Sequence, residues 1–146
     1  MPTTELHPQL RPAAPVVPIF AGHLLCIDDN PVNGLLIQEY FRLRMGLPVQ
    51  LASTGRAGLA MAQADRPLAL LLDLVLPDID GLEVLAHLRG LPALRDLPVA
   101  LVTAGATDLE LARARQLGAE HCWFKPLDLG QLDLMLCDLL SESTGP

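Results

Sequence analysis

The sequence is poor in aromatic residues and contains a single lysine. Aromatic side chains make up 3% of the 146 residues, whereas leucine fills 33 positions, so the core must be aliphatic. Nine of the ten basic residues are scattered arginines, and seventeen acidic residues bring the net charge to -7. A surface that binds nucleic acid needs a clustered basic patch. The composition therefore argues against nucleic-acid binding, and the one lysine, Lys125, stands out.

Cysteines are few and no apolar run is long. The three cysteines cannot all pair, and none has the spacing of a metal site or redox motif, which indicates a reducing, cytoplasmic setting. The longest uncharged stretch, Pro12–Ile27, is interrupted by proline and too short to span a bilayer, so no membrane association is expected. The patterns GxGxxG and GxxxxGK(S/T) are absent, which argues against a dinucleotide or nucleotide-triphosphate site.

Proline is concentrated at the amino terminus. Residues 1–21 hold five of the thirteen prolines and show no periodic pattern, which predicts an extended or disordered arm. From residue 22 to residue 140, short apolar runs alternate with amphipathic stretches, and residues 141–146 are expected to form a short tail. The apolar runs have the length of buried strands and are His23–Ile27, Pro48–Ala52, Leu68–Leu72, Pro98–Val102 and His121–Phe124.

Helix-capping signals separate these runs. They are Asn30 before Pro31, Thr54 before Ala57–Ala64, Asp80 before a helix that runs to Arg89, Thr107 with Glu110, and Asp128 with Gln131. Near-continuous apolar strands that alternate with helices predict a parallel sheet covered on both faces. We expect an α/β fold, a (βα)5 flavodoxin-like, doubly wound domain whose five-stranded parallel sheet has the order 2-1-3-4-5.

Polar residues follow the predicted strands at their carboxyl ends. Asp28 and Asp29 follow the first strand, Asp73 the third, Thr103 the fourth and Lys125 the fifth. Open α/β sheets bind ligands outside this edge, so the five side chains are expected to converge. Two carboxylates about 4 Å apart repel by roughly 4 kcal/mol at an effective dielectric of about 20. Mg2+ would relieve that repulsion.

The same set suggests a reaction. A lysine and a hydroxyl beside a metal form a clamp for a phosphoryl group. An aspartate within reach of that clamp is a plausible nucleophile, and its product is an acyl phosphate.

Four motifs in order resemble a known family. They are Asp28-Asp29-Asn30-Pro31, then Asp73-Leu-Val-Leu-Pro77-Asp-Ile-Asp80-Gly81, then Val102-Thr103-Ala104, and finally Lys125-Pro126. Together they make residues 23–140 similar to the response-regulator receiver domain of two-component signalling. The resemblance covers most of the chain, and the combination of motifs is far more specific than any one of them.

The resemblance implies roles for individual residues. Asp73 would be the phosphoacceptor. Asp29 and Asp73 would bind Mg2+ directly with the backbone carbonyl of Val75, and Asp28 would act through water. Lys125 would contact the phosphoryl oxygens, and the Lys125-Pro126 bond is expected to be cis, as in the family.

One position departs from the family pattern. Thr103 would move toward the phosphoryl group, and family members often carry a tyrosine or phenylalanine three residues before the lysine that responds to it. Here that residue is Cys122. The neighbouring Trp123 is expected to face outward from the fifth strand. The usual switch between threonine and an aromatic ring is therefore in question, but phosphoryl acceptance does not depend on it.

The resemblance also implies partners. The donor would be a histidine kinase or a histidine phosphotransfer protein, and the receiver would signal to a downstream protein target without being a turnover enzyme. The predicted last helix, Asp128–Leu140, carries apolar residues beyond the stripe that a sheet would bury, Leu134 among them. The face formed by the fourth helix, fifth strand and fifth helix is therefore expected to bind a partner or form a homodimer.

Several alternatives stay open. No output domain is recognisable before Pro146, so the chain is expected to be a stand-alone regulator, a phosphate relay, or the receiver of a hybrid histidine kinase. A receiver-like scaffold that is never phosphorylated is a second class. The third is a phosphohydrolase of the haloacid-dehalogenase type, but that class needs Asp-x-Asp after the first strand, whereas Asp28 and Asp29 are adjacent.

Overall fold

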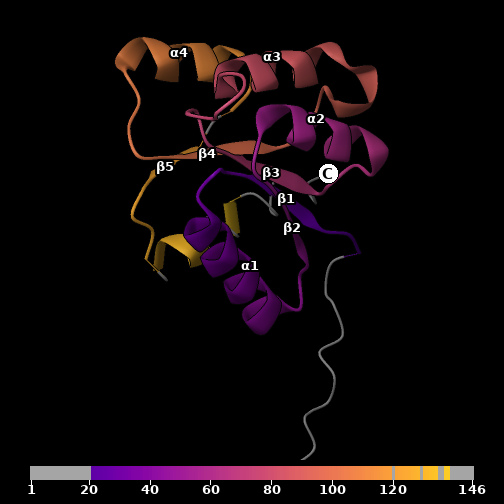
Figure 1. Ribbon diagram of the computed structural model, residues 1–146, viewed down its shortest axis with the longest axis vertical. Coiled ribbons are helices and arrows are strands. Elements are labelled where there is room, and N and C mark those ends of the chain that lie inside the picture. Colours follow the sequence, from indigo (N-terminus) through magenta and orange to yellow (C-terminus); the bar gives the residue numbers. More distant parts are fainter. Residues whose placement is uncertain (1–20, 120, 129, 135–136, 139–146) are drawn as a thin grey trace, which may run out of the picture.

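Five parallel strands form one sheet in the order β2-β1-β3-β4-β5 (Figure 1). The computed structural model describes residues 21–119, 121–128, 130–134 and 137–138. The strands are β1 (Leu24–Ile27), β2 (Val49–Ala52), β3 (Ala69–Leu72), β4 (Val99–Thr103) and β5 (His121–Phe124). The predicted flavodoxin-like fold and its strand order are confirmed.

The connecting helices begin at the predicted caps. They are α1 (Pro31–Met45), α2 (Gly55–Ala64), α3 (Gly81–Gly90) and α4 (Asp108–Gln116), with a 3-10 helix at Pro92–Leu94. Thr107 and Glu110 form the predicted capping box. Asp128 and Gln131 exchange backbone-to-side-chain hydrogen bonds of 3.0 and 2.8 Å, and residues 130–134 and 137–138 are helical where the fifth helix was expected.

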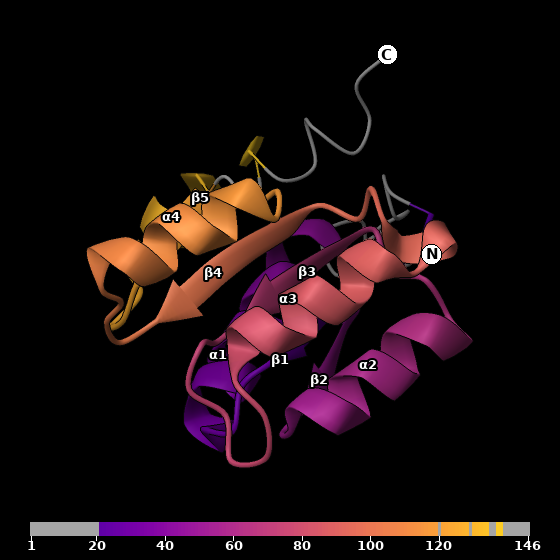
Figure 2. The same ribbon diagram turned by 90° about the horizontal axis from the view of Figure 1, so that it is seen from above.

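Each face of the sheet is covered by its own helices. The central strands are fully buried because they pack on both sides, with β1 and β3 showing four buried residues each. Helix α1 covers one face through Ile37 and Phe41. Leu132, which follows β5 in the sequence, packs into the same apolar cluster. Helices α2, α3 and α4 lie side by side over the other face (Figures 1 and 2). Because the strands are parallel, the carboxyl ends of β1, β3, β4 and β5 lie together at the same end of the sheet.

Residues 1–20 of the expected arm and the expected tail at 141–146 lie outside the described residues. The prediction that Trp123 faces outward is wrong, because its half-buried side chain packs against the apolar cluster beneath α1. The sequence pattern does not show that Leu127 and Leu132 cover that side of the edge strand. In the part of the chain that the structure describes, no helix has the length and apolar character needed to cross a membrane.

Candidate functional site

Three carboxylates meet at the carboxyl ends of the central strands β1 and β3. Asp28, Asp29 and Asp73 each offer an oxygen atom, and these oxygens lie within 4.8 Å of one another. Asp28 and Asp73 are buried, while Asp29 is exposed. The backbone fixes this arrangement, because the Asp28 amide donates to Ala52 O at 3.0 Å and the Asp73 amide to Ile27 O at 3.0 Å. The predicted convergence of the three acids is present.

Lys125 bridges the two buried acids. Its Nζ lies 2.7 Å from Asp73 Oδ2 and 2.8 Å from Asp28 Oδ2. Burial, the largest single influence, lowers the pKa of Lys125, but the hydrogen bonds and negative charges of Asp28 and Asp73 together outweigh burial and raise that pKa above its ordinary value. The lysine is therefore a fixed positive charge between two carboxylates. The Lys125-Pro126 peptide bond is cis, as the family resemblance implied.

Backbone amides hold the remaining carboxylate oxygens. Asp28 Oδ1 accepts from the Asn30 amide at 2.8 Å, and Asp73 Oδ1 accepts from the Val75 amide at 3.1 Å. Thr103 is fully buried, and its hydroxyl donates to Gly105 O at 3.3 Å. The Lys125 amide donates to Thr103 O at 2.9 Å. The threonine and the lysine are thus joined through the β4–β5 pairing.

Gly81 allows the chain to close beneath Asp73. Its amide donates to Leu74 O at 2.9 Å. A Cβ atom at this position would lie 2.3 Å from Asp73 O and 2.7 Å from Leu74 Cα. Both of these neighbours are backbone atoms, so a side chain would displace the segment that carries Asp73. Glycine is required here because of this close approach.

The acid cluster suits a hard divalent cation. Carboxylate and carbonyl oxygens are the ligands that Mg2+ prefers, and it usually binds through a few carboxylates while keeping several waters. Two buried acids and a third acid on the rim match that description, with Asp29 open to solvent. Among the described residues, no other group of three acidic, histidine or cysteine side chains lies close enough together to share an ion.

Cys122 lies away from the acids, on the face covered by α3 and α4. Its side chain is half buried beside a hollow of about 310 Å³ that Leu101, Leu111, Ala114 and Phe124 also line. Burial raises its pKa, so it is not an activated thiol. Cys122 stands at the sequence position where the resemblance led us to expect an aromatic residue, and its smaller side chain lines this hollow.

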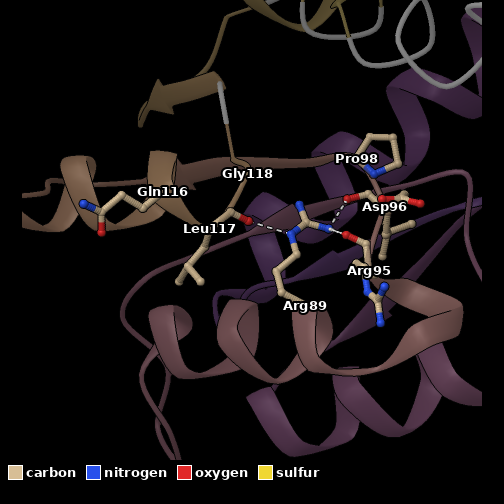
Figure 3. Close-up of a pocket in the computed structure, with 8 residues that line it drawn as sticks. Arg89, Arg95, Asp96, Pro98, Gln116, Leu117 and Gly118 are labelled. Atoms are coloured by element: carbon tan, nitrogen blue, oxygen red, sulfur yellow. Dashed lines mark hydrogen bonds between the residues drawn. The ribbon is translucent and has the colours of Figure 1, made fainter.

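A hollow of about 520 Å³ lies at the opposite end of the strands, next to the amino end of β4. It is lined by the end of α3, the start of β4 and the turn after α4, with Arg89 at its centre (Figure 3). The Arg89 guanidinium donates to Leu117 O at 2.5 Å, Leu97 O at 2.7 Å and Arg95 O at 2.9 Å. Burial lowers the pKa of Arg89. Its donors point at backbone carbonyls, so this hollow is a structural junction.

The sequence missed one residue beside the site. Asp78, in the loop between β3 and α3, binds the amides of Gly55 and Arg56 at the start of α2. A carboxylate five residues after Asp73 was the only available signal, and sequence spacing does not reveal a partner more than twenty residues away.

Comparison with known proteins agrees with this geometry. A family model described as the response regulator receiver domain matches residues 24–137. The response regulator MprA of Mycobacterium tuberculosis is 36% identical over 112 residues, which are 75% of this chain and 46% of that protein. This chain spans about half the length of the response regulators that it matches.

Solved structures show the same fold. A CheY-like receiver domain protein from Methanospirillum hungatei has a TM-score of 0.78 at 23% identity, covering 85% of this chain and 97% of that one. The receiver domain of the sensor histidine kinase PA1611 from Pseudomonas aeruginosa has a magnesium ion in its active site cleft. It is 27% identical, with a TM-score of 0.73 over 84% of this chain and 99% of that chain. The chain belongs to the response regulator receiver domain family of two-component systems.

Proposed function

We propose that Asp73 accepts a phosphoryl group from a phosphohistidine, carried by a histidine kinase or a histidine phosphotransfer protein. The observation that carries this proposal is the ion triad itself. Lys125 Nζ lies within 2.8 Å of two buried carboxylates, and Asp29 completes a cluster whose oxygens lie within 4.8 Å. Buried acids that repel one another are costly for stability and are retained where a ligand or reaction uses them.

The transfer is a nucleophilic substitution at phosphorus. A carboxylate oxygen of Asp73 forms the new O–P bond while the P–N bond to the donor imidazole breaks. The electron pair of that bond leaves with the imidazole, which takes up a proton. Lys125 then contacts the phosphoryl oxygens and offsets their charge. Each domain carries one phosphoryl group at a time, so it is a signalling domain and not a turnover enzyme.

Mg2+ is part of the proposal. Asp29, Asp73 and the Val75 carbonyl would hold it directly, and Asp28 through water. The cation would offset the negative charge of the carboxylates and the incoming phosphoryl group. Val75 is suited to this role because its amide already binds Asp73 at 3.1 Å, which fixes the orientation of the neighbouring peptide.

The donor is proposed to dock beside α1. Helix α1 is apolar around much of its circumference, since Ile37 and Phe41 are buried while Val32 and Leu35 are 71% and 54% exposed. Val32 lies three residues after Asp29, and the 71% exposed Val75 lies two residues after Asp73. An apolar rim around an acidic site suits a carrier protein that must deliver a histidine to it.

The signal is proposed to leave through the α4–β5 face, defined by the exposed residues Leu109, Phe124 and Leu134. Thr103, which pairs with Phe124 across β4 and β5, would turn toward the phosphoryl group. This face would then bind a downstream target or a second copy of the chain.

The three cysteines are free, which agrees with a cytoplasmic site of action.

Phosphorylation by acetyl phosphate tests the proposal. The wild-type protein is expected to gain one acyl phosphate, detected by intact mass and released by hydroxylamine, only when Mg2+ is present. Asp73→Asn should gain none. Asp80→Asn is the matched control, because it removes an acid from the same loop while asparagine keeps the α3 cap.

Other outcomes identify the alternatives. Uptake of phosphate by Asp73→Asn at the wild-type rate would disprove the assignment of the phosphoacceptor. A wild-type protein that takes up no phosphate with Mg2+ present would support the interaction scaffold instead. Sustained hydrolysis of the donor over many turnovers would support a phosphohydrolase.

A further inference from the structure

The loop that follows Asp73 is fastened to the start of α2 by one side chain. Asp78 Oδ1 accepts a hydrogen bond from the Gly55 amide at 2.8 Å, and Asp78 Oδ2 accepts one from the Arg56 amide at 2.9 Å. The Asp78 side chain is 22% exposed. Both of its oxygens are therefore committed to a segment more than twenty residues away in the sequence.

Helix α2 already has a cap of its own. Thr54 Oγ1 accepts from the Ala57 amide at 3.1 Å. No acidic residue lies in the first turn of α2, so Asp78 supplies the negative charge that favours a helix start. The hydrogen bond from the Arg56 amide is the main cause that lowers the pKa of Asp78. Thr54 therefore binds the Ala57 amide within its own segment, and Asp78 binds the Gly55 and Arg56 amides from the other loop.

The packing around this contact is close. A Cβ atom at Gly55 would lie 2.6 Å from Ile79 Cγ1 and 2.8 Å from Val84 Cγ2. The absence of a side chain at Gly55 thus lets α2 rest directly on the residue after Asp78. The loop and the helix fit together as one unit.

The same loop carries two proposed ligands of the cation. Its first part is fixed by the bonds from the Val75 amide to Asp73 and from the Gly81 amide to Leu74 O. Val75 is 71% exposed, so its side chain adds little packing that would hold the carbonyl in place. Asp80 caps α3, which directly follows the loop, whereas Asp78 bonds the middle of the loop to the distant start of α2.

We propose that Asp78 is a positioning residue, which holds the Val75 carbonyl and Asp73 in place by fastening their loop to α2. The inference rests on the proposed function, since it concerns the geometry of the same Mg2+ and phosphoryl site. Supporting groups behind metal ligands are typically worth about 10- to 100-fold in affinity. Loss of Asp78 should therefore weaken Mg2+ binding about tenfold, near the lower end of that range, because Asp78 acts through the loop.

Amide hydrogen exchange in the metal-free protein tests the contact itself. Asp78→Ala should speed exchange at Gly55 and Arg56 and leave Ala57 protected. Thr54→Ala, the matched control, should speed exchange at Ala57 and leave the other two amides protected. Asp78→Asn keeps one acceptor oxygen and should give an intermediate result.

Calorimetric titration with Mg2+ then tests the positioning role. Asp78→Ala should bind about tenfold more weakly than wild type, Asp78→Asn should recover part of that loss, and Thr54→Ala should bind like wild type. Equal Mg2+ affinities in Asp78→Ala and Thr54→Ala would overturn the inference, whatever their melting temperatures. A wild-type protein that binds no Mg2+ would count against the proposed function instead, and the exchange experiment would still decide whether Asp78 fastens the loop.

Discussion

Single atoms decide the geometry around Asp73, and Gly81 is the clearest case. A Cβ at Gly81 would lie 2.3 Å from a backbone oxygen, whereas a Cβ at Gly90, at the other end of α3, would meet nothing within 4 Å. We expect Gly81→Ala to cost about 2 kcal/mol of unfolding free energy, the typical cost of overpacking. It should also slow phosphoryl uptake, because the segment that carries Asp73 must shift.

Gly90→Ala is the control for that prediction. Alanine reduces the conformational freedom of the unfolded chain, so this variant should gain about 0.5 kcal/mol and keep the wild-type rate of uptake. Urea unfolding and acetyl phosphate labelling measure both quantities. Equal stabilities for the two variants would show that the close approach at Gly81 is relieved without cost.

Cys26 predicts a pH dependence of stability. Burial, followed by the nearby charge of Asp28, raises the pKa of this 2% exposed thiol from 9.0 to about 12. The folded state therefore keeps the neutral thiol when the unfolded state has lost its proton. This contribution is complete below pH 9 and is lost as the pH rises from 9 toward 12.

Between pH 8 and pH 10, wild type should lose about 1 kcal/mol more unfolding free energy than Cys26→Ala. Cys137→Ala removes an exposed thiol and should follow the wild-type curve. Urea titrations at the two pH values measure the difference. Parallel losses in wild type and Cys26→Ala would show that the thiol does not titrate in this way.

At the scale of elements, Arg89 joins the ends of several segments. Its guanidinium binds carbonyls of Arg95, Leu97 and Leu117, which lie before β4 and after α4 (Figure 3). Gly118, with φ of 90°, leaves room for that guanidinium. Arg89→Met keeps the apolar stem but leaves these carbonyls without their charged donor. We expect a loss of about 3 kcal/mol, since each bond to a charged group contributes about 1.5–3 kcal/mol and water replaces part of it.

Arg95→Met is the matched control for the junction. Arg95 lines the same hollow, and its exposed side chain should contribute within about 0.5 kcal/mol. Both variants should keep Mg2+-dependent phosphorylation, because the junction lies at the opposite end of the strands from Asp73. A stability loss that is equal in the two variants would show that the carbonyl contacts of Arg89 are dispensable.

Most of the helices and strands, and most of the site, could be predicted from the sequence. Strand order, four helix caps and the convergence of Asp28, Asp73 and Lys125 follow from local patterns and from one rule about parallel sheets. The first two residues of α2 do not, because the pattern places the helix at Ala57–Ala64 after the correct cap Thr54, whereas the helix already begins at Gly55. Its first amides are bound by Asp78, which is remote in the sequence. The inward packing of Trp123 does not follow from the sequence for a similar reason, since the residues that cover it lie beyond its strand.

At the scale of the whole molecule, the acidic site and the structural junction at Arg89 lie far apart. The acidic cluster lies at the carboxyl ends of the strands and the Arg89 junction at their amino ends, so we expect changes at one end to leave the other intact. Exposed leucines lie on both layers, with Leu43 on α1 67% exposed and Leu109 on α4 84% exposed. Two separate apolar surfaces fit a protein that meets a donor through one face and a target or second copy through another.

We expect the α4–β5 face to bind a second copy of the chain, because the charges of α4 are arranged for such a pairing. Helix α4 has Asp108 and Glu110 in its first turn and Arg113 and Arg115 in its last turn. Two such helices that pack antiparallel about a two-fold axis would bring each acidic end to the other's basic end. Leu134 belongs to residues 130–134, which are helical, and Asp138 further along lies with its carboxylate 3.8 Å from His121 Nδ1 on β5. The exposed apolar side chains would then be buried between the copies.

Light scattering with and without beryllofluoride, a phosphoryl mimic, tests this assembly. Wild type is expected to form a dimer with Mg2+ and beryllofluoride, and Leu134→Glu to stay monomeric, because a 58% exposed leucine would be replaced by a charge in the contact. Leu43→Glu, which places the same charge on α1, should dimerise like wild type. A wild type that remains monomeric at high micromolar concentration in both states would exclude the homodimer. The α4–β5 face would then serve a different protein, since its exposed apolar residues would still be uncovered in the isolated chain.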